Sequence, residues 1–301
     1  MDFQASVANA MKAPGLSHMR PVIEKELLHY DLLFILDKEG LLDNLTFQGG
    51  TSLRLCYGAP RFSEDLDFVG GHDFASQQLM AIKDCIEHYI GKRYGLEVIV
   101  KTPSSLQNQI EQQELNVDKW QVAIVTSPGQ KHLPRQRIKL EVVNIPAYSR
   151  EPQALKLNYD FLPDGYADTL IMTESLDEVM TEKLVSLVNC QRYVRHRDIW
   201  DLRWLKQQGA QMNMTWLSNK IRDYSIANYT ERLDKMWQDL PGIIHGDAFQ
   251  SELTRFIPMD VQQRTLAKDK FYDHLSNEIR GLLETVRREL NNTPTENEFR
   301  M

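Results

Sequence analysis

The chain contains 301 residues, of which 42% are hydrophobic and 26% charged, and its formal net charge is −7. This composition is typical of a globular protein and excludes disordered and collagen-like classes. The longest apolar runs, such as residues 32–36 and 184–188, are far shorter than the ~20 residues that a membrane-spanning helix needs. The N-terminus lacks the apolar stretch of a secretion signal, and three scattered cysteines fit a reducing compartment. The sequence therefore predicts a cytoplasmic protein with no membrane segment.

In chain order, the first predicted helix covers about residues 21–40, with Pro21 in its first turn and Gly40 at its end. A second helix is expected from about Phe74 to Tyr94. The pattern then changes to runs rich in β-branched residues, which predict three strands. These strands are expected at residues 96–100, 120–126 and 137–145, and Pro128, Gly129 and residues 131–134 mark a hairpin connection between the last two.

After Pro163 the strand signal fades and helical patterns dominate. The clearest late helix is a stripe of apolar residues at spacings of three and four, from Phe271 to Leu290. We therefore expect an α+β fold, with a mixed β-sheet flanked by helices over residues 1–165. A mostly helical domain is expected over residues 166–301, ending in a flexible tail from 291 to 301.

One segment carries the residues that indicate chemistry, FQGGTSLRLCYGAPRFSEDLDFVGG at positions 47–71. Asp65 and Asp67 are two apart on a predicted strand, so both carboxylates point to the same side, about 6.5 Å apart along the backbone. Such a pair can bind Mg²⁺, and phosphate oxygens and water molecules then complete the coordination shell of the ion. Upstream, Gly49 and Gly50 allow the backbone to approach a phosphate, and Thr51 and Ser52 can open a helix whose N-terminus favours anions.

Taken singly, an Asp-x-Asp pair is often a solvated strand edge, and a Gly-Gly pair is often only a turn. Their combination resembles the nucleotidyltransferase fold of the DNA polymerase β superfamily. The segments GGTSLRL and RFSEDLDF more closely resemble the AbiEii/MenT nucleotidyltransferase toxins of toxin–antitoxin and abortive-infection systems. The resemblance covers about residues 20–210 and continues through IKLEVVNI with Glu141, TEKLVSLV with Lys183, and RHRDIWDLRWL with Asp198 and Asp201.

The resemblance implies a role for each matched residue. Asp65, Asp67 and Glu141 would bind Mg²⁺ or Mn²⁺, although the family more commonly has Asp where this chain has Glu141. Lys183 and the Gly49 to Ser52 turn would bind the triphosphate of an NTP. Asp198 would orient Lys183 or a ribose, and Ser63 would contact a phosphate. The spacing from Gly50 to Asp65, fifteen residues, is at the long end of the superfamily range.

The same residues also allow plainer interpretations. Glu141 could belong to a solvent-facing row of the strand, and Lys183 could extend along the apolar side of its helix. Either Asp198 or Asp201 could balance a neighbouring arginine, the common arrangement for an acid on a helix. Ser63 could brace the turn after Pro60.

Positive charge is concentrated in two segments of this acidic chain. Residues 131–150 carry a net charge of +4, and residues 182–206 carry +3. Both segments belong to the expected neighbourhood of the site, which favours a phosphate-rich substrate, although basic runs are often only solvated faces.

Together these features predict a Mg²⁺-dependent nucleotidyltransferase that transfers NMP from an NTP to a hydroxyl. Family resemblance implies a toxin whose acceptor is RNA, tRNA 3′ ends in particular, and whose partner is a cognate antitoxin. Two alternatives stay open: an enzyme of this fold that modifies a small molecule or a protein, and a non-catalytic protein that binds nucleotide or antitoxin.

Overall fold

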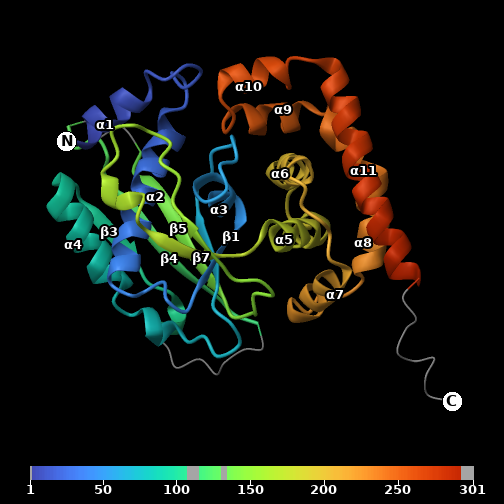
Figure 1. Cartoon of the computed structure of the whole chain (residues 1–301), viewed down its shortest axis with the longest axis horizontal. Helices are drawn as coiled ribbons and strands as arrows, with labels where there is room; N and C mark the ends of the chain where they lie inside the picture. Colours follow the sequence, from blue (N-terminus) through green and yellow to red (C-terminus); the bar gives the residue numbers. More distant parts are fainter. Residues whose placement is uncertain (1, 107–114, 130–133, 293–301) are drawn as a thin grey trace. The chain divides into compact units, whose positions relative to one another are not determined.

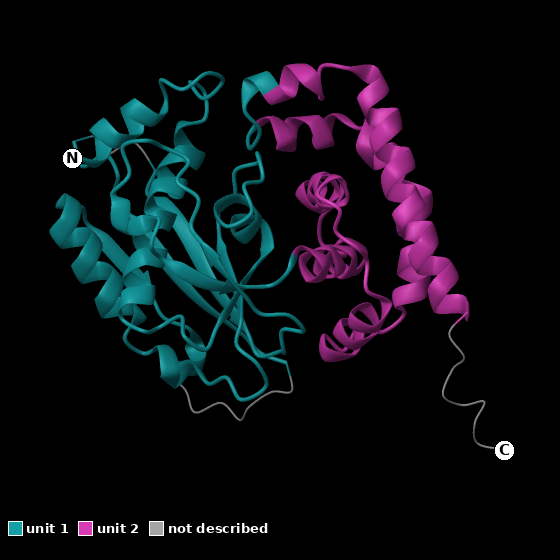
Figure 2. Ribbon diagram, in the orientation of Figure 1, with its two compact units in different colours: residues 1–175, 255–260 teal, residues 176–254, 261–301 magenta. Residues whose placement is uncertain are grey.

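The structure, a computed structural model, describes residues 2–106, 115–129 and 134–292 (Figure 1). The chain divides into two compact units, which Figure 2 distinguishes by colour. The first unit comprises residues 1–175 and 255–260, and the second comprises residues 176–254 and 261–301. The division after Ser175 lies later than the boundary expected at residue 165. The first unit also includes a short segment from the C-terminal third.

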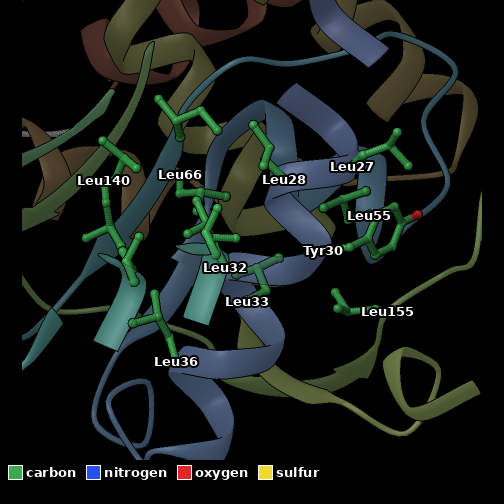
Figure 3. Close-up of a cluster of buried hydrophobic side chains, with 14 of the residues drawn as sticks. Leu27, Leu28, Tyr30, Leu32, Leu33, Leu36, Leu55, Leu66, Leu140 and Leu155 are labelled. Atoms are coloured by element: carbon green, nitrogen blue, oxygen red, sulfur yellow. The ribbon is translucent and has the colours of Figure 1, made fainter. Parts of the chain in front are cut away.

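Helix α2 (Arg20–Lys38) forms where the sequence predicts it, with Pro21 in its first turn. It follows α1 (Phe3–Ala10), which the sequence analysis did not predict. Pro is tolerated in the first turn because its missing N–H would have no partner within the helix. Gly40, just beyond the helix, adopts a positive φ of 70°. The buried side of α2 supplies much of the hydrophobic core of the first unit, and Figure 3 shows its leucines Leu27, Leu28, Leu32, Leu33 and Leu36 grouped with Leu66 and Leu140.

A mixed seven-stranded sheet forms the centre of the first unit, as the predicted fold class requires. Its strands lie in the order β3-β4-β5-β2-β1-β7-β6. The pairs β2/β5 and β1/β7 are parallel and the other pairs are antiparallel. The strands are β1 (Thr46–Gln48), β2 (Leu66–Val69), β3 (Val98–Lys101), β4 (Val117–Ile124), β5 (Gln136–Val143), β6 (Glu151–Ala154) and β7 (Leu170–Thr173).

The two faces of β4 and β5 differ in polarity because successive side chains of a strand point to opposite sides. One face carries residues such as Trp120 and Leu140, which are fully buried in the core together with α2 and α4 (Ile82–Tyr94). The opposite face is exposed or half-buried and mostly polar. Its residues include Lys119, Gln121, Arg137, Lys139 and Glu141. This polar face of the sheet contains the predicted carboxylates.

Two expectations about secondary structure are wrong. The helix expected from Phe74 begins only at Ile82, after a short 3₁₀ turn, η1 (Ser76–Leu79). The Ser76 hydroxyl there donates to the Asp118 carboxylate of β4, which ties this turn to the sheet. Strands also continue beyond Pro163, because β7 pairs in parallel with β1. A four-residue strand gives almost no periodic signal, and pairing with a distant strand decides its structure. The expected hairpin does join β4 and β5, although residues 130–133 lie outside the described residues.

The second unit is helical, as predicted. In this unit α5 contacts α6, α7 and α8, and α8 packs along α11. Lys220 of α7 is fully buried between Glu178 and Glu182 of α5, with 2.9 Å from its Nζ to a carboxylate oxygen of each. The helices are α5 (Leu176–Asn189), α6 (His196–Gln207), α7 (Met214–Asp223), α8 (Tyr229–His245), α9 (Asp247–Thr254), α10 (Met259–Arg264), which begins in the first unit, and α11 (Asp269–Asn292).

Two short 3₁₀ turns, η2 (Ser104–Leu106) and η3 (Asp164–Tyr166), complete the described elements. The predicted tail from 291 falls largely on residues 293–301, which lie outside the described residues. Among the helices described here, none combines the length and apolar composition that crossing a bilayer requires.

Candidate active site

The Gly49-Gly50 turn connects β1 to α3 (Gly49–Leu55) and packs directly against Asp67, one of the predicted carboxylates. Gly49 has a φ of 80°, a conformation that favours glycine. A Cβ atom on Gly49 would lie 2.8 Å from Oδ2 of Asp67, and one on Gly50 would lie 2.9 Å from Oγ of Ser63. The side chains of Asp67, Ser63 and Arg61 therefore surround the bare backbone of this turn. The structure thus gathers four of the residues that the sequence singled out, Gly49, Gly50, Ser63 and Asp67.

The two hydroxyls that follow the turn are directed into the protein. Thr51 and Ser52 are fully buried. The Thr51 hydroxyl donates to the backbone carbonyl of Asp65, and the Ser52 hydroxyl donates to the carbonyl of Gly49 at 2.9 Å. In this structure both side chains therefore hold the turn and the carboxylate segment together.

The loop from α3 to β2 is held by residues that the sequence analysis did not single out. Lys25 of α2 forms an ion pair with Glu64, with 2.7 Å between Nζ and Oε1. His29 of α2 donates its Nε2–H to the Glu64 carbonyl at 3.0 Å. Burial lowers the pKa of His29 to about 4, against smaller opposing contributions from its hydrogen bond and from nearby acids. The ring is therefore neutral at physiological pH and supports the loop as a hydrogen-bond donor.

Arg54 of α3 fixes the beginning of the same loop. Its guanidinium binds both carboxylate oxygens of Glu26, at 2.7 and 3.1 Å, and donates to the Ala59 and Pro60 carbonyls at 3.1 and 3.3 Å. Such a bidentate pair is strong and geometrically specific. Arg54 and Glu26 thus connect α3 to α2 and restrict the loop that carries Arg61 and Ser63.

Asp67 and Glu141 are neighbours across the parallel pair β2/β5, where they occupy the same register position. Paired residues of adjacent strands share a face, and the strands lie ~4.8 Å apart. Gln48 of β1 occupies the register position on the other side of Asp67. The structure therefore places the second and third predicted carboxylates side by side on the polar face of the sheet.

Asp65 precedes β2 by one residue and is held by Lys139. Its Oδ1 accepts the backbone N–H of Lys139 at 3.1 Å, and its Oδ2 lies 3.3 Å from Lys139 Nζ. Glu141 in turn forms an ion pair with Lys119, its register partner on β4, with 3.1 Å from Oε1 to Nζ. Attraction to Asp65 raises the pKa of Lys139, partial burial opposes the rise, and Glu141 and Asp67 add to it.

The donor chemistry of this group suits a hard divalent cation. Mg²⁺ in proteins is commonly held by one or two carboxylates, while substrate phosphates and water complete its shell. Asp67 and Glu141 supply such a pair. Within the described residues, however, no three His, Cys, Asp or Glu side chains are gathered closely enough to hold one metal ion together. A site that includes Asp65 as a third ligand therefore stays a prediction.

The predicted residues of the second unit form a buried cluster of their own. Lys183 Nζ lies 2.6 Å from Asp198 Oδ1 and 3.0 Å from Asp201 Oδ2, so both aspartates bind the lysine. Ser186 donates to Asp198 at 2.8 Å, and Arg195 donates to the same carboxylate. Burial favours a higher pKa for Asp198, but Lys183 and Arg195 outweigh it and hold that pKa well below its usual range. Asp198 is therefore ionised.

Many of the basic residues counted in the two positive segments have acidic partners elsewhere in the chain. In the first segment, Arg135 pairs with Glu97 and Lys139 with Asp65. In the second, the pairs are Lys183 with Asp198 and Asp201, Arg195 with Asp198, Arg197 with Glu252, and Lys206 with Glu278. A charge count over a sequence window already includes Asp198 and Asp201, but it omits the distant acids Glu97, Asp65, Glu252 and Glu278. The segments are therefore less positive in the folded chain than their net charges suggest.

Comparisons with known proteins identify one family. The family model described as "Nucleotidyl transferase AbiEii toxin, Type IV TA system" matches residues 31–288. No curated protein matches the chain.

Solved structures that resemble it at low sequence identity include the following three. MenT4, the nucleotidyltransferase toxin Rv2826c from Mycobacterium tuberculosis H37Rv, is 19% identical with a TM-score of 0.49, over 80% of this chain and 72% of that one. JHP933 from Helicobacter pylori is 18% identical with a TM-score of 0.48, over 90% and 93% of the two chains. A putative nucleotidyltransferase from H. pylori is 18% identical with a TM-score of 0.46, over 89% and 98%.

Proposed function

Because this chain belongs to the AbiEii nucleotidyltransferase toxin family of type IV toxin–antitoxin systems, we propose that it transfers NMP from an NTP to an RNA hydroxyl with the help of Mg²⁺ or Mn²⁺. Family membership identifies the chain as a nucleotidyltransferase and implies an NTP substrate and an antitoxin partner. The metal, the acceptor and the residue roles are the content of the proposal.

The observation that carries the proposal is the contact between the Gly49 turn and Asp67, whose register partner is Glu141. Asp67 and Glu141 share a register position, and the backbone of Gly49 lies against Asp67. A turn without side chains beside two carboxylates lets a cation and a phosphate occupy neighbouring positions. A divalent ion there would activate the attacking hydroxyl and stabilise the leaving pyrophosphate. Asp67 and Glu141, joined by Asp65, would hold that ion.

The triphosphate is proposed to bind at the glycine turn. Ser63 contacts the space beside Gly50 and would donate to a phosphate oxygen, while the Thr51 and Ser52 hydroxyls keep the turn in place. Lys183 would contribute positive charge to the phosphates, and Asp198 would position its ammonium group, which it binds at 2.6 Å. The roles of Lys183 and Asp198 rest on the family resemblance.

The proposed acceptor is RNA, with tRNA 3′ ends as the preferred site. Support comes from Lys119, Arg137 and Lys139, which lie beside the carboxylates on the polar face of the sheet. Cationic side chains next to the reacting group are suited to the phosphates of a polynucleotide. NTP and RNA are both cytoplasmic, and the three cysteines are free thiols, so we place the activity in the cytoplasm.

The test is a labelling experiment with the purified chain, each α-labelled NTP in turn, Mg²⁺ or Mn²⁺, and total tRNA. We expect one or more NTPs to label tRNA, and Asp67→Asn to abolish labelling. Asp73→Asn makes the same exchange at an exposed position and should label like wild type. Label on a polypeptide or small molecule would favour the first alternative function. Nucleotide binding without any labelled product, or full labelling by Asp67→Asn, would refute the proposed mechanism.

A further inference from the structure

Two lysines act as counter-ions to the predicted metal ligands. Lys139 Nζ lies 3.3 Å from Asp65, and Lys119 Nζ lies 3.1 Å from Glu141. Both ammonium groups come from the polar face of the same sheet. Asp65 and Glu141 therefore each have a lysine of the sheet as a cationic partner.

The strand register fixes these lysines in place. Lys139 precedes Glu141 by two residues on β5, so the two side chains share a face, and Lys119 is the register partner of Glu141 on β4. The backbone N–H of Lys139 also binds Asp65, so this residue contacts Asp65 through two separate groups. The register of the sheet therefore brings each lysine next to its carboxylate.

The exposure of the two lysine side chains allows their ammonium groups to move away from the carboxylates. About half of each is exposed to solvent, 50% for Lys139 and 57% for Lys119, whereas the carboxylates are 30% and 25% exposed. The acids are thus the fixed members of each pair, and the ammonium groups sit at the ends of flexible stems.

Because of charge balance, the lysine ammonium groups can leave the carboxylates only when an anion enters the site. By themselves, the three carboxylates and the two ammonium groups carry a net charge of −1, and the Arg61 guanidinium at the glycine turn makes the neighbourhood less negative still. A divalent cation entering alone would make the group net positive and leave the displaced ammonium groups without partners. A triphosphate entering with the cation supplies new partners for both.

Accordingly, and resting on the proposed function, we propose that Lys139 and Lys119 are resident counter-ions that a divalent cation replaces only together with the nucleotide. In the free protein they hold Asp65 and Glu141 in position and lower the affinity for metal. When the nucleotide binds, their ammonium groups turn to its phosphates. Metal binding and nucleotide binding are therefore cooperative, and these lysines are positioning residues for the site.

The test measures Mn²⁺ binding by the EPR signal of the free ion, with and without a non-hydrolysable NTP analogue. Wild-type protein should bind Mn²⁺ weakly alone and at least about tenfold more tightly with the analogue. Without nucleotide, Lys139→Met should bind Mn²⁺ about fivefold more tightly than wild type. Adding the analogue should reduce or reverse that advantage, because the variant lacks an ammonium group for the phosphates. Lys119→Met should change in the same direction, which provides a second variant if Lys139→Met fails to fold.

Lys101→Met is the matched control. Lys101 is exposed on the same sheet face but two strands away from β5, on β3, so its ammonium group has no carboxylate of the site beside it. Its Mn²⁺ affinity should equal that of wild type. Equal tightening in Lys101→Met would indicate a general charge effect and refute the inference.

Asp67→Asn separates this inference from the proposed function. If Asp67→Asn loses Mn²⁺ while both lysine variants bind it like wild type, the counter-ion role is wrong and the metal site stands. If the wild-type chain binds no Mn²⁺ even with the analogue, both proposals fail.

Discussion

Gly49 and Asp67 are in contact: a Cβ atom on Gly49 would lie 2.8 Å from Oδ2 of Asp67. Gly49→Ala should therefore cause two separable defects. Its φ of 80° makes any side chain strained, at a cost of about 1–3 kcal/mol in free energy of unfolding. The added methyl group would also displace the Asp67 carboxylate, and a displacement of about 1 Å in a reacting group can reduce the rate about 100-fold. Urea unfolding and initial rates of nucleotidyl transfer measure the two effects.

Gly71→Ala separates strain from displacement. Gly71 has nearly the same φ, 81°, but an added Cβ would meet nothing within 4 Å. This variant should lose similar stability and keep its transfer rate. Equal rate losses in both variants would contradict the role assigned to the Gly49–Asp67 contact.

Asp198→Asn should destabilise the second unit in a pH-dependent way. The folded-state pKa of Asp198 lies below its unfolded value, so its ionised form stabilises the fold above about pH 4. That contribution is lost as the pH falls through the folded-state pKa. At pH 7 the substitution should cost about 3 kcal/mol, because it weakens a buried pair with Lys183 that Asp201 only partly replaces. Below pH 4 the cost should shrink.

Chemical denaturation at pH 7 and pH 3 measures this change. The control is Asp239→Asn, at an exposed position of α8, which should cost little at either pH. A cost for Asp198→Asn that did not fall with pH would show that hydrogen bonding, and not charge, is the source of its stabilisation.

Asp31 should give the opposite pH dependence. Burial raises its pKa to about 6, although Arg93, Tyr166 and Tyr94 favour the ionised form. A carboxyl with a raised folded-state pKa stabilises the fold at low pH, and that contribution is lost as the pH rises from about 4 to 6. The loss of free energy of unfolding caused by Asp31→Asn should therefore decrease between pH 4 and pH 7, by up to about 3 kcal/mol.

The measurement is the difference in free energy of unfolding between the two proteins across this pH range. Reporting the difference cancels the titration of all other groups. A pH-independent difference would mean that Asp31 titrates alike in the folded and unfolded states.

Phe256→Ala should destabilise the first unit, although the residue lies in the C-terminal third of the sequence. Phe256 is fully buried in the core of that unit, and its carbonyl accepts the backbone N–H of Phe62 at 2.8 Å. Removing a buried phenylalanine side chain costs about 3–5 kcal/mol. Met259→Ala, in the same segment but 44% exposed, should cost far less. Hydrogen exchange of the Phe62 amide should report the local loosening, and unchanged protection would contradict this connection.

Local sequence patterns predicted the elements that have strong local signals. The leucine spacing of α2 and the alternating residues of β5 were sufficient to place both elements, and the fold class followed. The Asp-x-Asp motif and its resemblance to a family also singled out Glu141, which the structure places beside Asp67. The two elements were placed by short-range periodicity, and the role of Glu141 as a metal ligand stays a prediction.

Sequence patterns did not predict what depends on partners far apart in the chain. Lys119 meets Glu141 only because β4 pairs with β5 in one particular register, and a shift of one residue would turn Lys119 to the other face. The positive charge of residues 182–206 was similarly offset by acids such as Glu252 and Glu278, which lie outside that window. The position of Lys139 relative to Glu141 could be predicted from the sequence, because two residues that are two apart on an alternating strand lie on the same face.

The return of residues 255–260 to the first unit has a consequence for biosynthesis. Phe256 is fully buried in the core of that unit, so the core of the unit that bears the carboxylates is completed by a residue translated late. Domains ordinarily fold as units, N-terminal first, as they leave the ribosome. A chain whose translation stopped before residue 255 would contain every carboxylate of the site yet lack part of the core that supports it. A prematurely terminated chain would therefore contain the carboxylate motif in a first unit whose core is incompletely packed.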